Sequence, residues 1–275
     1  MQVITIGNYK GGGGKSTLAI HLAHYALEQD LRVLFIDMDP KGSSSRSLLK
    51  EFPQLEAKVS QMLEPGFKLA EFAISAGIRV IQGDKQITNF EGTGIAFARN
   101  LAAMKDDWDL CVIDTSPSAS FMQVLPLSVA DYVLSPVELS EWLYRDQIPF
   151  LNILKNLKAK SSLSKPKFLG LLPSRVARYS NIQSKDFNDL AANSDFRAKV
   201  FSDGQYHVPM KDCYLHTAQT GQPIWYIKDN LSVGDEVKKI KEICAAVLTE
   251  MDFSVDTGEP ALSDDLAAFI AKISI

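Results

Sequence analysis

The sequence predicts an α/β domain of three layers, in which a mostly parallel, twisted β-sheet is flanked by helices. Three stretches support this prediction. Residues 3–6 form a short apolar run that leads into a glycine-rich loop and then into an apolar, helix-like segment. Two further apolar runs, at 33–36 and 110–113, are each followed by aspartate. Uninterrupted apolar runs of this length are typical of strands buried on both faces of a parallel sheet.

Composition indicates an ordinary globular chain with no bulk affinity for nucleic acid. Of its 275 residues, 46% are hydrophobic and 23% charged, and the formal net charge is −4. Any DNA binding must therefore come from a local basic patch, or from one that a second subunit completes. Three widely spaced cysteines, without a CxxC pair, indicate neither a disulfide framework nor a zinc site and fit a reducing, cytoplasmic location. We expect no signal peptide and no membrane-spanning run of about 18 apolar residues.

The glycine-rich loop at residues 7–17 predicts a binding site for a polyphosphate. Its four consecutive glycines place no Cβ atom in the way, so backbone N–H groups can surround an anion. The helix that begins near Lys15 directs the positive end of its dipole toward the same anion. A flexible linker is the alternative, but a linker would not stand between a strand-like run and an apolar helix. The residues assigned to this site are Gly11, Gly12, Gly13, Gly14, Lys15, Ser16, which is placed to ligate Mg²⁺, and Thr17.

An additional lysine distinguishes this loop from the common phosphate loop. In the pattern G-x-x-x-x-G-K-[ST] the first glycine would fall at Tyr9, and Lys10 lies beside it. The loop K-G-G-x-G-K-[ST] resembles that of the ParA/MinD family of dimeric ATPases. The resemblance covers most of the chain, most closely residues 1–45 and 107–140, and implies a P-loop NTPase fold that binds ATP and Mg²⁺. It also implies that Lys10 reaches across a dimer to the nucleotide of the partner subunit. Lys15 can reach the outer phosphates of the nucleotide in its own loop.

Three aspartates follow apolar strands and resemble the switch segments of the same family. Residues 37–41 resemble its D-x-D-P-Q segment, with lysine in place of glutamine, which implies that Asp37 lies near Mg²⁺ and that Asp39 positions the attacking water. Asp114 ends the next apolar strand, where a carboxylate can hold a water of the metal, the Walker B role. The alternative for 37–41 is a surface turn begun by aspartate and proline. Hydroxyls at 115–120 could suggest a serine nucleophile, but capping hydroxyls of a switch loop fit better.

The remaining segments complete one domain over residues 1–251, followed by a tail over 252–275. Pro53 and the Pro65–Gly66 pair should interrupt helices within 48–76, and the tail ends in a short helix that packs on the body or on a partner. We expect helices at about 15–30, 92–105, 140–160, 181–199, 231–251 and 263–275, and strands at 78–83, 130–138, 167–173 and 206–209. We also expect a polar turn at 42–47, near which a helix begins.

The resemblance also implies contacts to the adenine base and to DNA. In the family the loop after the strand at 167–173 borders the base, which points to Ser174 and Arg175, and we add Pro209 from the short edge strand. The lysines at 238 and 239 could equally form a solvated helix face. The residues that we assign to DNA contact are Arg175, Arg178, Lys211, Lys238 and Lys239.

Taken together, the resemblance implies a ParA-like ATPase. Such a protein closes into an ATP-dependent sandwich homodimer, binds nonspecific DNA of the nucleoid, and positions a plasmid, chromosome or protein organelle with a cargo-bound adaptor that stimulates slow hydrolysis. A MinD-like membrane ATPase is one alternative, but the tail lacks the basic amphipathic face that membrane binding needs. A metabolic P-loop enzyme of the dethiobiotin-synthetase or amidotransferase type is another. A relative of the nitrogenase iron protein would need cluster-ligating cysteines beside the switches, and the three dispersed cysteines argue against it.

Overall fold

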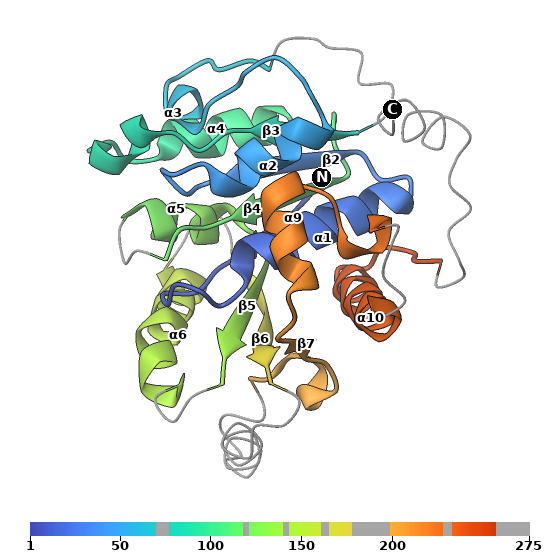
Figure 1. Ribbon diagram of the computed structural model, residues 1–275. Helices are drawn as coiled ribbons and strands as arrows, with labels where there is room; N and C mark the ends of the chain where they lie inside the picture. Colours follow the sequence, from blue (N-terminus) through green and yellow to red (C-terminus); the bar gives the residue numbers. More distant parts are fainter. Residues whose placement is uncertain are drawn as a thin grey trace.

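The described strands form one parallel sheet of seven strands (Figure 1). The computed structural model describes residues 1–69, 77–117, 121–139, 143–160, 165–177, 199–227 and 233–256. The strand order is β3-β2-β4-β1-β5-β6-β7, and every neighbouring pair is parallel, so the predicted fold class is confirmed. The strands are β1 (Gln2–Ile6), β2 (Val33–Asp37), β3 (Ile78–Ile81), β4 (Leu110–Asp114), β5 (Tyr132–Glu138), β6 (Lys167–Val176) and β7 (Val208–Pro209).

Helices cover both faces of the sheet and give the fold its three layers. Figure 1 shows α9 in front of α1, with α10 beside them and α6 below the start of α1. Within the described ranges, no helix combines the length and hydropathy that crossing a membrane requires. The α-helices are α1 (Lys15–Glu28), α2 (Ser43–Glu51), α3 (Val59–Met62), α4 (Ile95–Ala103), α5 (Phe121–Val129), α6 (Leu143–Lys160), α9 (Cys213–Thr220) and α10 (Gly234–Glu250); short 3-10 turns are η1 (Lys85–Asn89), η2 (Phe201–Gly204) and η3 (Ile224–Tyr226).

Successive side chains of the central strands enter two different cores. In β2, Val33 and Phe35 pack in the core that contains α1, α2, α9 and α10, whereas Leu34 and Ile36 pack with α3, α4 and α5. Strands β1 and β4 alternate in the same way, and α6 packs near β5 in a smaller cluster around Phe150. Since each strand is apolar on both sides, burying it between two helix layers explains the uninterrupted apolar runs in the sequence.

Parallel pairing brings the carboxyl ends of the central strands to one edge of the sheet. Asp37 at the end of β2 is in register with Asp114 at the end of β4, and Ile6 at the end of β1 is in register with Asp114 on the other side. The glycine-rich loop leaves β1 at this edge. Ligands of open α/β sheets bind at such an edge, so the topology assembles the candidate site from three separate segments.

Two predicted boundaries shift, and each shift has a local cause. A helix begins in the polar segment at 42–47, as expected, but it starts at Ser43, so most of this segment belongs to α2 and not to a turn. The backbone N–H and the hydroxyl of Ser45 both donate to Asp37 and hold the first turn of this helix. Strand β6 continues three residues beyond its predicted end at 173, to Val176, because pairing with β7 extends it. Near the end of β6, the register with β7 shifts between Ser174 and Val176, at Arg175, whose φ is +56°.

Several other predicted elements differ in extent or lie outside the described residues. Of the helical segments expected over 48–76, the structure describes the end of α2 and the short α3. No helix is predicted at α5, where Pro126 interrupts the pattern; the Thr5 hydroxyl donates to the Pro126 carbonyl oxygen (3.0 Å) and ties this helix to β1. Outside the described residues lie 70–76, Arg178, most of the helix expected at 181–199, and the helix expected at 263–275. The proposed division at residue 251 stays a prediction.

Two histidines on the inner face of α1 are buried in the neutral form. His21 and His24 are both 0% exposed. His21 Nδ1 lies 2.7 Å from the carbonyl oxygen of Thr17, and His24 Nε2 lies 2.8 Å from that of Gly221, so in each ring this nitrogen is the donor. Burial lowers the pKa of His21 to about 4 and the pKa of His24 to about 3. Neutral imidazoles therefore connect the start of the chain to the segment after α9.

We expect acid to destabilise the fold through these histidines, and His24→Gln to weaken the effect. Between pH about 6.5 and the lowered pKa values, the unfolded chain binds protons that the folded chain excludes, so this stabilisation is complete above that window and is lost as the pH falls. From pH 7.5 to 5.5 the loss is about 1.4 kcal/mol for each histidine. Urea unfolding at both pH values measures it; the glutamine amide can keep the bond to Gly221, and an equal loss in both proteins would contradict the assignment.

Candidate functional site

The glycine-rich loop shapes an uncapped helix end. Gly14 is the N-cap of α1 with φ +82°, a left-handed conformation that favours glycine, and it provides no side-chain cap. A Cβ on Gly13 would come within 2.9 Å of the Pro136 carbonyl oxygen, so the loop can pass β5 only with glycine at this position. The first N–H groups of α1 thus stay available, and their direction and the helix dipole suit an anion.

Lys15 lies inside the loop. The residue is 6% exposed, and its Nζ donates to the backbone carbonyl oxygen of Lys10 at 3.1 Å. Burial lowers the pKa of this amine, while Asp114 and Asp39 act against that shift through their charges. An ammonium group held inside a phosphate loop and close to two carboxylates is positioned to neutralise a bound polyphosphate, as the sequence predicts.

Asp114 is a buried carboxylate at the end of β4. It is 0% exposed, and neither of its oxygens has a hydrogen-bond partner among the described residues. Burial, with the neighbouring charge of Asp37, raises its pKa to about 7; the nearby Ser16 and Ser44 hydroxyls and Lys15 oppose this, although neither hydroxyl reaches hydrogen-bond geometry. Because a lone buried carboxylate is costly, these two oxygens fit a cation, and the donor set of Asp114 and the Ser16 hydroxyl is the hard-oxygen type that Mg²⁺ prefers.

Asp37 has a different environment from Asp114, although the two carboxylates are neighbours. Its oxygens accept three hydrogen bonds: from the backbone N–H of Asp39 and of Ser45, both 2.9 Å, and from the Ser45 hydroxyl, 2.8 Å. Burial raises its pKa and these bonds oppose the shift. Asp37 therefore fixes the start of α2 and the turn to Asp39. Its predicted role near a metal stays a prediction.

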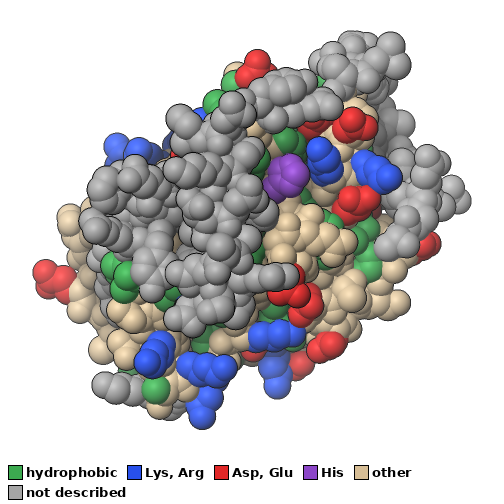
Figure 2. Space-filling model, turned by 90° about the horizontal axis from the view of Figure 1, so that it is seen from below, with side chains coloured by type: hydrophobic (Ala, Val, Ile, Leu, Met, Phe, Trp, Pro, Cys, Tyr) green, Lys and Arg blue, Asp and Glu red, His purple; other side chains and the backbone are tan. Residues whose placement is uncertain are grey.

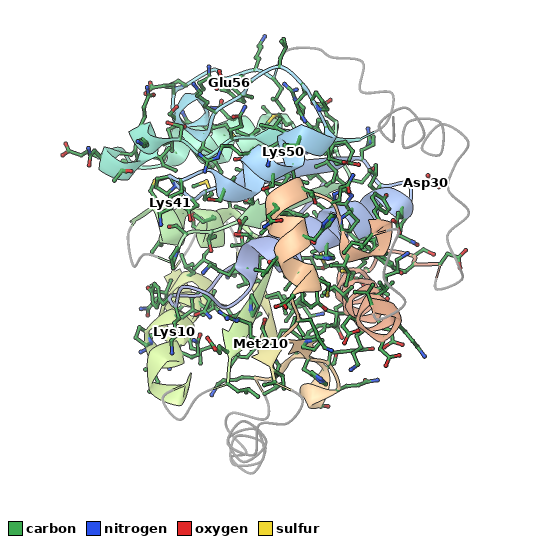
Figure 3. The ribbon with its side chains drawn as sticks, in the orientation of Figure 1. Lys10, Asp30, Lys41, Lys50, Glu56 and Met210 are labelled. Atoms are coloured by element: carbon green, nitrogen blue, oxygen red, sulfur yellow. The ribbon has the colours of Figure 1, made fainter. Side chains whose placement is uncertain are left out.

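Lys10 and Asp39 lie on the outer side of the site. Lys10 is exposed, and Figure 3 shows it at the loop end of α1, whereas Asp30 lies near the other end of this helix. Asp39 is half-buried, and its Oδ1 accepts the backbone N–H of Lys41 at 2.9 Å. The structure thus places the two lysines of the loop differently: Lys15 points into the loop, and Lys10 is at the surface.

The predicted base-contact residues line one cavity of about 310 Å³ beside the loop. It is closed by α9 and by the ends of β6 and β7. Arg175 donates to the carbonyl oxygen of Gly12 at 3.2 Å, which links the end of β6 to the loop. Met210 and Leu215 border the cavity and are 53% and 61% exposed (Figure 3 labels Met210). The predicted site residues in this lining are Gly12, Gly14, Thr17, Ser174, Arg175, Pro209 and Lys211.

Acidic side chains lie beside two of the predicted DNA-contact lysines in the described part of the chain, which does not include Arg178. Lys211 forms an ion pair with Glu236 (3.4 Å), and Lys238 lies 4.0 Å from Glu242 on α10. On the face seen from below in Figure 1, Figure 2 shows lysine and arginine side chains interspersed with aspartate and glutamate among the described residues. Lys239 is half-buried on α10 and lowers the pKa of His207, which burial also lowers. The roles of these residues in DNA contact stay predictions.

Asn8 is central to the loop, although no role is predicted for it from the sequence. Asn8 is 1% exposed; its Nδ2 donates to the Pro136 carbonyl oxygen (2.8 Å), and its Oδ1 accepts the backbone N–H of Lys10 (3.1 Å). Asparagine commonly bonds the backbone two residues along, which was the available signal. The second acceptor bond of Oδ1, from Gln147 Nε2, comes from α6 and could not be read from local sequence.

Fold and loop together define a class of protein. A parallel sheet with a phosphate loop after β1 and aspartates at the ends of β2 and β4 is the architecture of P-loop nucleoside triphosphatases. The family model described as an AAA domain matches residues 1–165, more than half of the chain. The chain belongs to this family and, within it, to the ParA/MinD family of partition-type ATPases, which confirms the predicted resemblance.

Curated relatives include two kinds of protein. Protein IncC of Escherichia coli is 28% identical over 267 residues, which cover 92% of this chain and 71% of that protein. Maintenance of carboxysome distribution protein A (McdA) of Gloeothece citriformis is 28% identical over 197 residues, which cover 68% of this chain and 75% of that protein. Both are similar to this chain over more than its phosphate loop.

Solved structures share the fold at lower identity. McdA of Cyanothece without nucleotide has a TM-score of 0.73 and 22% identity, covering 90% of this chain and 99% of that one. Cobyrinic acid a,c-diamide synthase of Mycobacterium smegmatis with ADP and magnesium has a TM-score of 0.69 and 20% identity, covering 94% and 97%. ParA of pNOB8, bound to nonspecific DNA, has a TM-score of 0.60 and 22% identity, covering 91% and 98%. These likenesses concern the fold.

We expect Asp114→Asn to stabilise the protein in the absence of metal. The substitution removes a buried charge that has no partner among the described residues and keeps the shape of the side chain. We expect a gain of about 1–3 kcal/mol because a neutral amide avoids the additional cost of burying a charge, although its own polar atoms stay buried. Thermal unfolding at pH 8 with EDTA measures the change, and Asp109→Asn, at an ion-paired and partly exposed carboxylate, is the control that should not gain. A lower melting temperature for Asp114→Asn would show that the carboxylate is already satisfied.

Proposed function

We propose that this protein is a ParA-like ATPase that hydrolyses ATP to ADP and phosphate and positions a cargo on DNA. In this proposal two subunits close around two nucleotides, the closed dimer binds nonspecific DNA of the nucleoid, and a cargo-bound adaptor stimulates hydrolysis. The observation that carries the proposal is the separation of the two lysines of the loop: Lys15 is buried within it, and Lys10 is exposed at its edge. The relatives IncC and McdA support partition or positioning as the general function.

The nucleotide and its metal fit the groups around the loop. The N–H groups at the start of α1 and the amine of Lys15 would hold the phosphates; Asp114, with Ser16, would hold the metal through its unpartnered oxygens. When bound, Mg²⁺ screens phosphate charge and orients the terminal group. The cavity beside the loop, with Ser174, Arg175 and Pro209 in its lining, is the proposed base site.

Exposed Lys10 is proposed to serve the neighbouring subunit. The loop of Lys10 already contains a buried ammonium group, that of Lys15. A second cation at the surface can therefore contact the nucleotide of a second subunit that approaches this side. Attraction between this cation and the phosphates of the facing nucleotide favours the closed dimer only while the triphosphate is present. The charge would also stabilise the transition state, as cations supplied from a partner do in phosphoryl transfer.

Asp39 is proposed to position the attacking water. It is half-buried at the open side of the site, and its backbone N–H donates to Asp37, whose carboxylate is fixed by Ser45. The Oδ1 of Asp39 accepts the N–H of Lys41, which leaves Oδ2 for other contacts. A carboxylate on a short turn that is anchored at both ends can hold a water in one orientation.

We expect Lys10→Ala to abolish ATP-dependent dimerisation while ATP still binds. The buried Lys15 and the backbone N–H groups remain, so the affinity of one subunit for ATP should change by no more than about threefold, whereas stimulated hydrolysis should fall by at least about 10-fold because the charge across the interface is lost. Sedimentation velocity with MgATP and a fluorescent-nucleotide titration measure the two effects.

The control for this variant is Lys85→Ala, at an exposed lysine of η1 on the side of β3. It should behave as wild type. Unchanged dimerisation of Lys10→Ala would refute the role across the interface, and fast ATP turnover by a monomer without DNA or adaptor would favour a metabolic enzyme, which the fold shared with the diamide synthase allows.

We expect retention on nonspecific DNA to require MgATP and to weaken steeply with salt. In the described part of one subunit, Lys211 and Lys238 have acidic neighbours, so a single subunit offers little net positive surface and a dimer is needed to add contacts. The variant with Lys238→Ala and Lys239→Ala should lower the slope of log affinity against log salt by about 2, and Lys85→Ala should leave it unchanged. Salt-independent retention, or ATP-dependent sedimentation with anionic liposomes, would contradict the DNA role.

A further inference from the structure

The strand-proximal arm of the phosphate loop rests on helix α6. Figure 1 shows α6 under this part of the loop, and two contacts of described residues confirm that they touch. The ring of Phe150 packs edge-on against Tyr9, with centroids 5.9 Å apart, and Gln147 Nε2 donates to Asn8 Oδ1 at 3.1 Å. A Cβ on Gly7 would also come within 3.4 Å of the Phe150 ring. Helix α6 is therefore the support of residues 7–10.

Asn8 connects this support to the peptide of Lys10. Its Oδ1 accepts two bonds, one from Gln147 Nε2 and one from the backbone N–H of Lys10, both 3.1 Å, while its Nδ2 donates to the Pro136 carbonyl oxygen. The carbonyl oxygen of Lys10 in turn accepts Lys15 Nζ. The backbone N–H and the backbone carbonyl of Lys10 are thus both bound by side chains. The backbone from which its exposed side chain extends is therefore held in place.

The network also determines how the two amides are oriented. Asn8 must present oxygen to the N–H of Lys10 and nitrogen to the carbonyl of Pro136, so its orientation is fixed by backbone groups. Gln147 must then present nitrogen to Asn8, which leaves its own Oε1 in the interior. That oxygen is buried and has no hydrogen-bond partner among the described residues, and Gln147 is 0% exposed.

An amide in this position is unfavourable for the fold taken alone. A buried oxygen without a partner costs free energy, and an apolar side chain of similar size would avoid that cost. Asn8 Oδ1 would still accept the bond from Lys10 if Gln147 were replaced, so no group of the loop would be left without a partner. The benefit of Gln147 therefore lies in restraining Asn8, and through it the loop.

We propose that Gln147 is a positioning residue for Lys10: its amide restrains Asn8, which holds the Lys10 peptide in the conformation from which the lysine reaches a second nucleotide. This inference rests on the role of Lys10 in the proposed function. Among the described residues, Gln147 does not line the base cavity, and it reaches the loop through its bond to Asn8.

The test is the variant Gln147→Met, which keeps the length of the side chain and removes its donor. Without nucleotide, its melting temperature should equal or exceed that of wild type, because the unpartnered Oε1 is gone. Hydrogen–deuterium exchange of peptides covering residues 7–12 should nevertheless become about two- to tenfold faster, the range that corresponds to loss of one neutral hydrogen bond. The MgATP concentration for half-maximal dimerisation should rise by a similar factor.

Asn156→Met is the matched control, because it also replaces an amide side chain with methionine, but at an exposed position of α6. It should leave all three measurements unchanged. Gln147→Leu, which also lacks the donor and favours a helix, replaces Gln147→Met if that variant does not fold. Unchanged exchange of residues 7–12 would overturn the inference. So would a lower melting temperature with faster exchange throughout α6 and β5, which indicates a merely structural amide. If wild type itself forms no dimer with MgATP, the proposed function fails, whereas the exchange comparison still decides the restraint of the loop by Gln147.

Discussion

A buried carboxylate next to an uncapped helix end is the constraint on which the rest of the site depends. Asp114 is fully buried and has no hydrogen-bond partner among the described residues, so without a cation the fold carries an unfavourable group. The N-terminus of α1 presents the opposite sign a short way along the same edge. Lys15 lies close enough to both to lower the cost, and the parallel sheet holds all three together. A bound metal and polyphosphate would complete this charge arrangement.

The neighbouring Asp37 shows how the same residue type can serve the fold instead. Its carboxylate accepts three protein hydrogen bonds and caps α2, so it needs no further ligand to be satisfied. Two aspartates in register on adjacent strands therefore differ in what they can do: one anchors the segment that carries Asp39, and the other keeps free acceptors. The site therefore combines one carboxylate whose hydrogen bonds come from the protein with another whose oxygens remain available to a ligand.

Contacts between α2 and α9 connect that anchored segment to the cavity. The Ser47 hydroxyl donates to the Ala218 carbonyl oxygen, and Lys50 donates to that of Gln219, both at 2.6 Å. Gly221, with φ +81°, lies so close to the Ser47 backbone that a Cβ would come within 2.1 Å of its carbonyl oxygen. Helix α9 also lines the cavity through Tyr214 and Ala218. Helix α9 thus contacts both the segment after Asp37 and the proposed base site, although the two are far apart in sequence.

The sequence by itself determined the strands that lead to the site, the loop and the three aspartates, because apolar runs, glycines and strand-terminal carboxylates are local signals. Arg175 and Pro209, which the resemblance pointed to, lie in the lining of the cavity beside the loop, and their contact with a base stays a prediction. Tertiary structure alone decided which carboxylate is satisfied, which lysine is buried, and that Gln147 from α6 supports Asn8. It also turned the serines at 43–47 into the start of a helix by presenting Asp37 to them. These outcomes depend on groups that are distant in the chain, such as Ser45 for Asp37 and Gln147 for Asn8, so no local pattern encodes them.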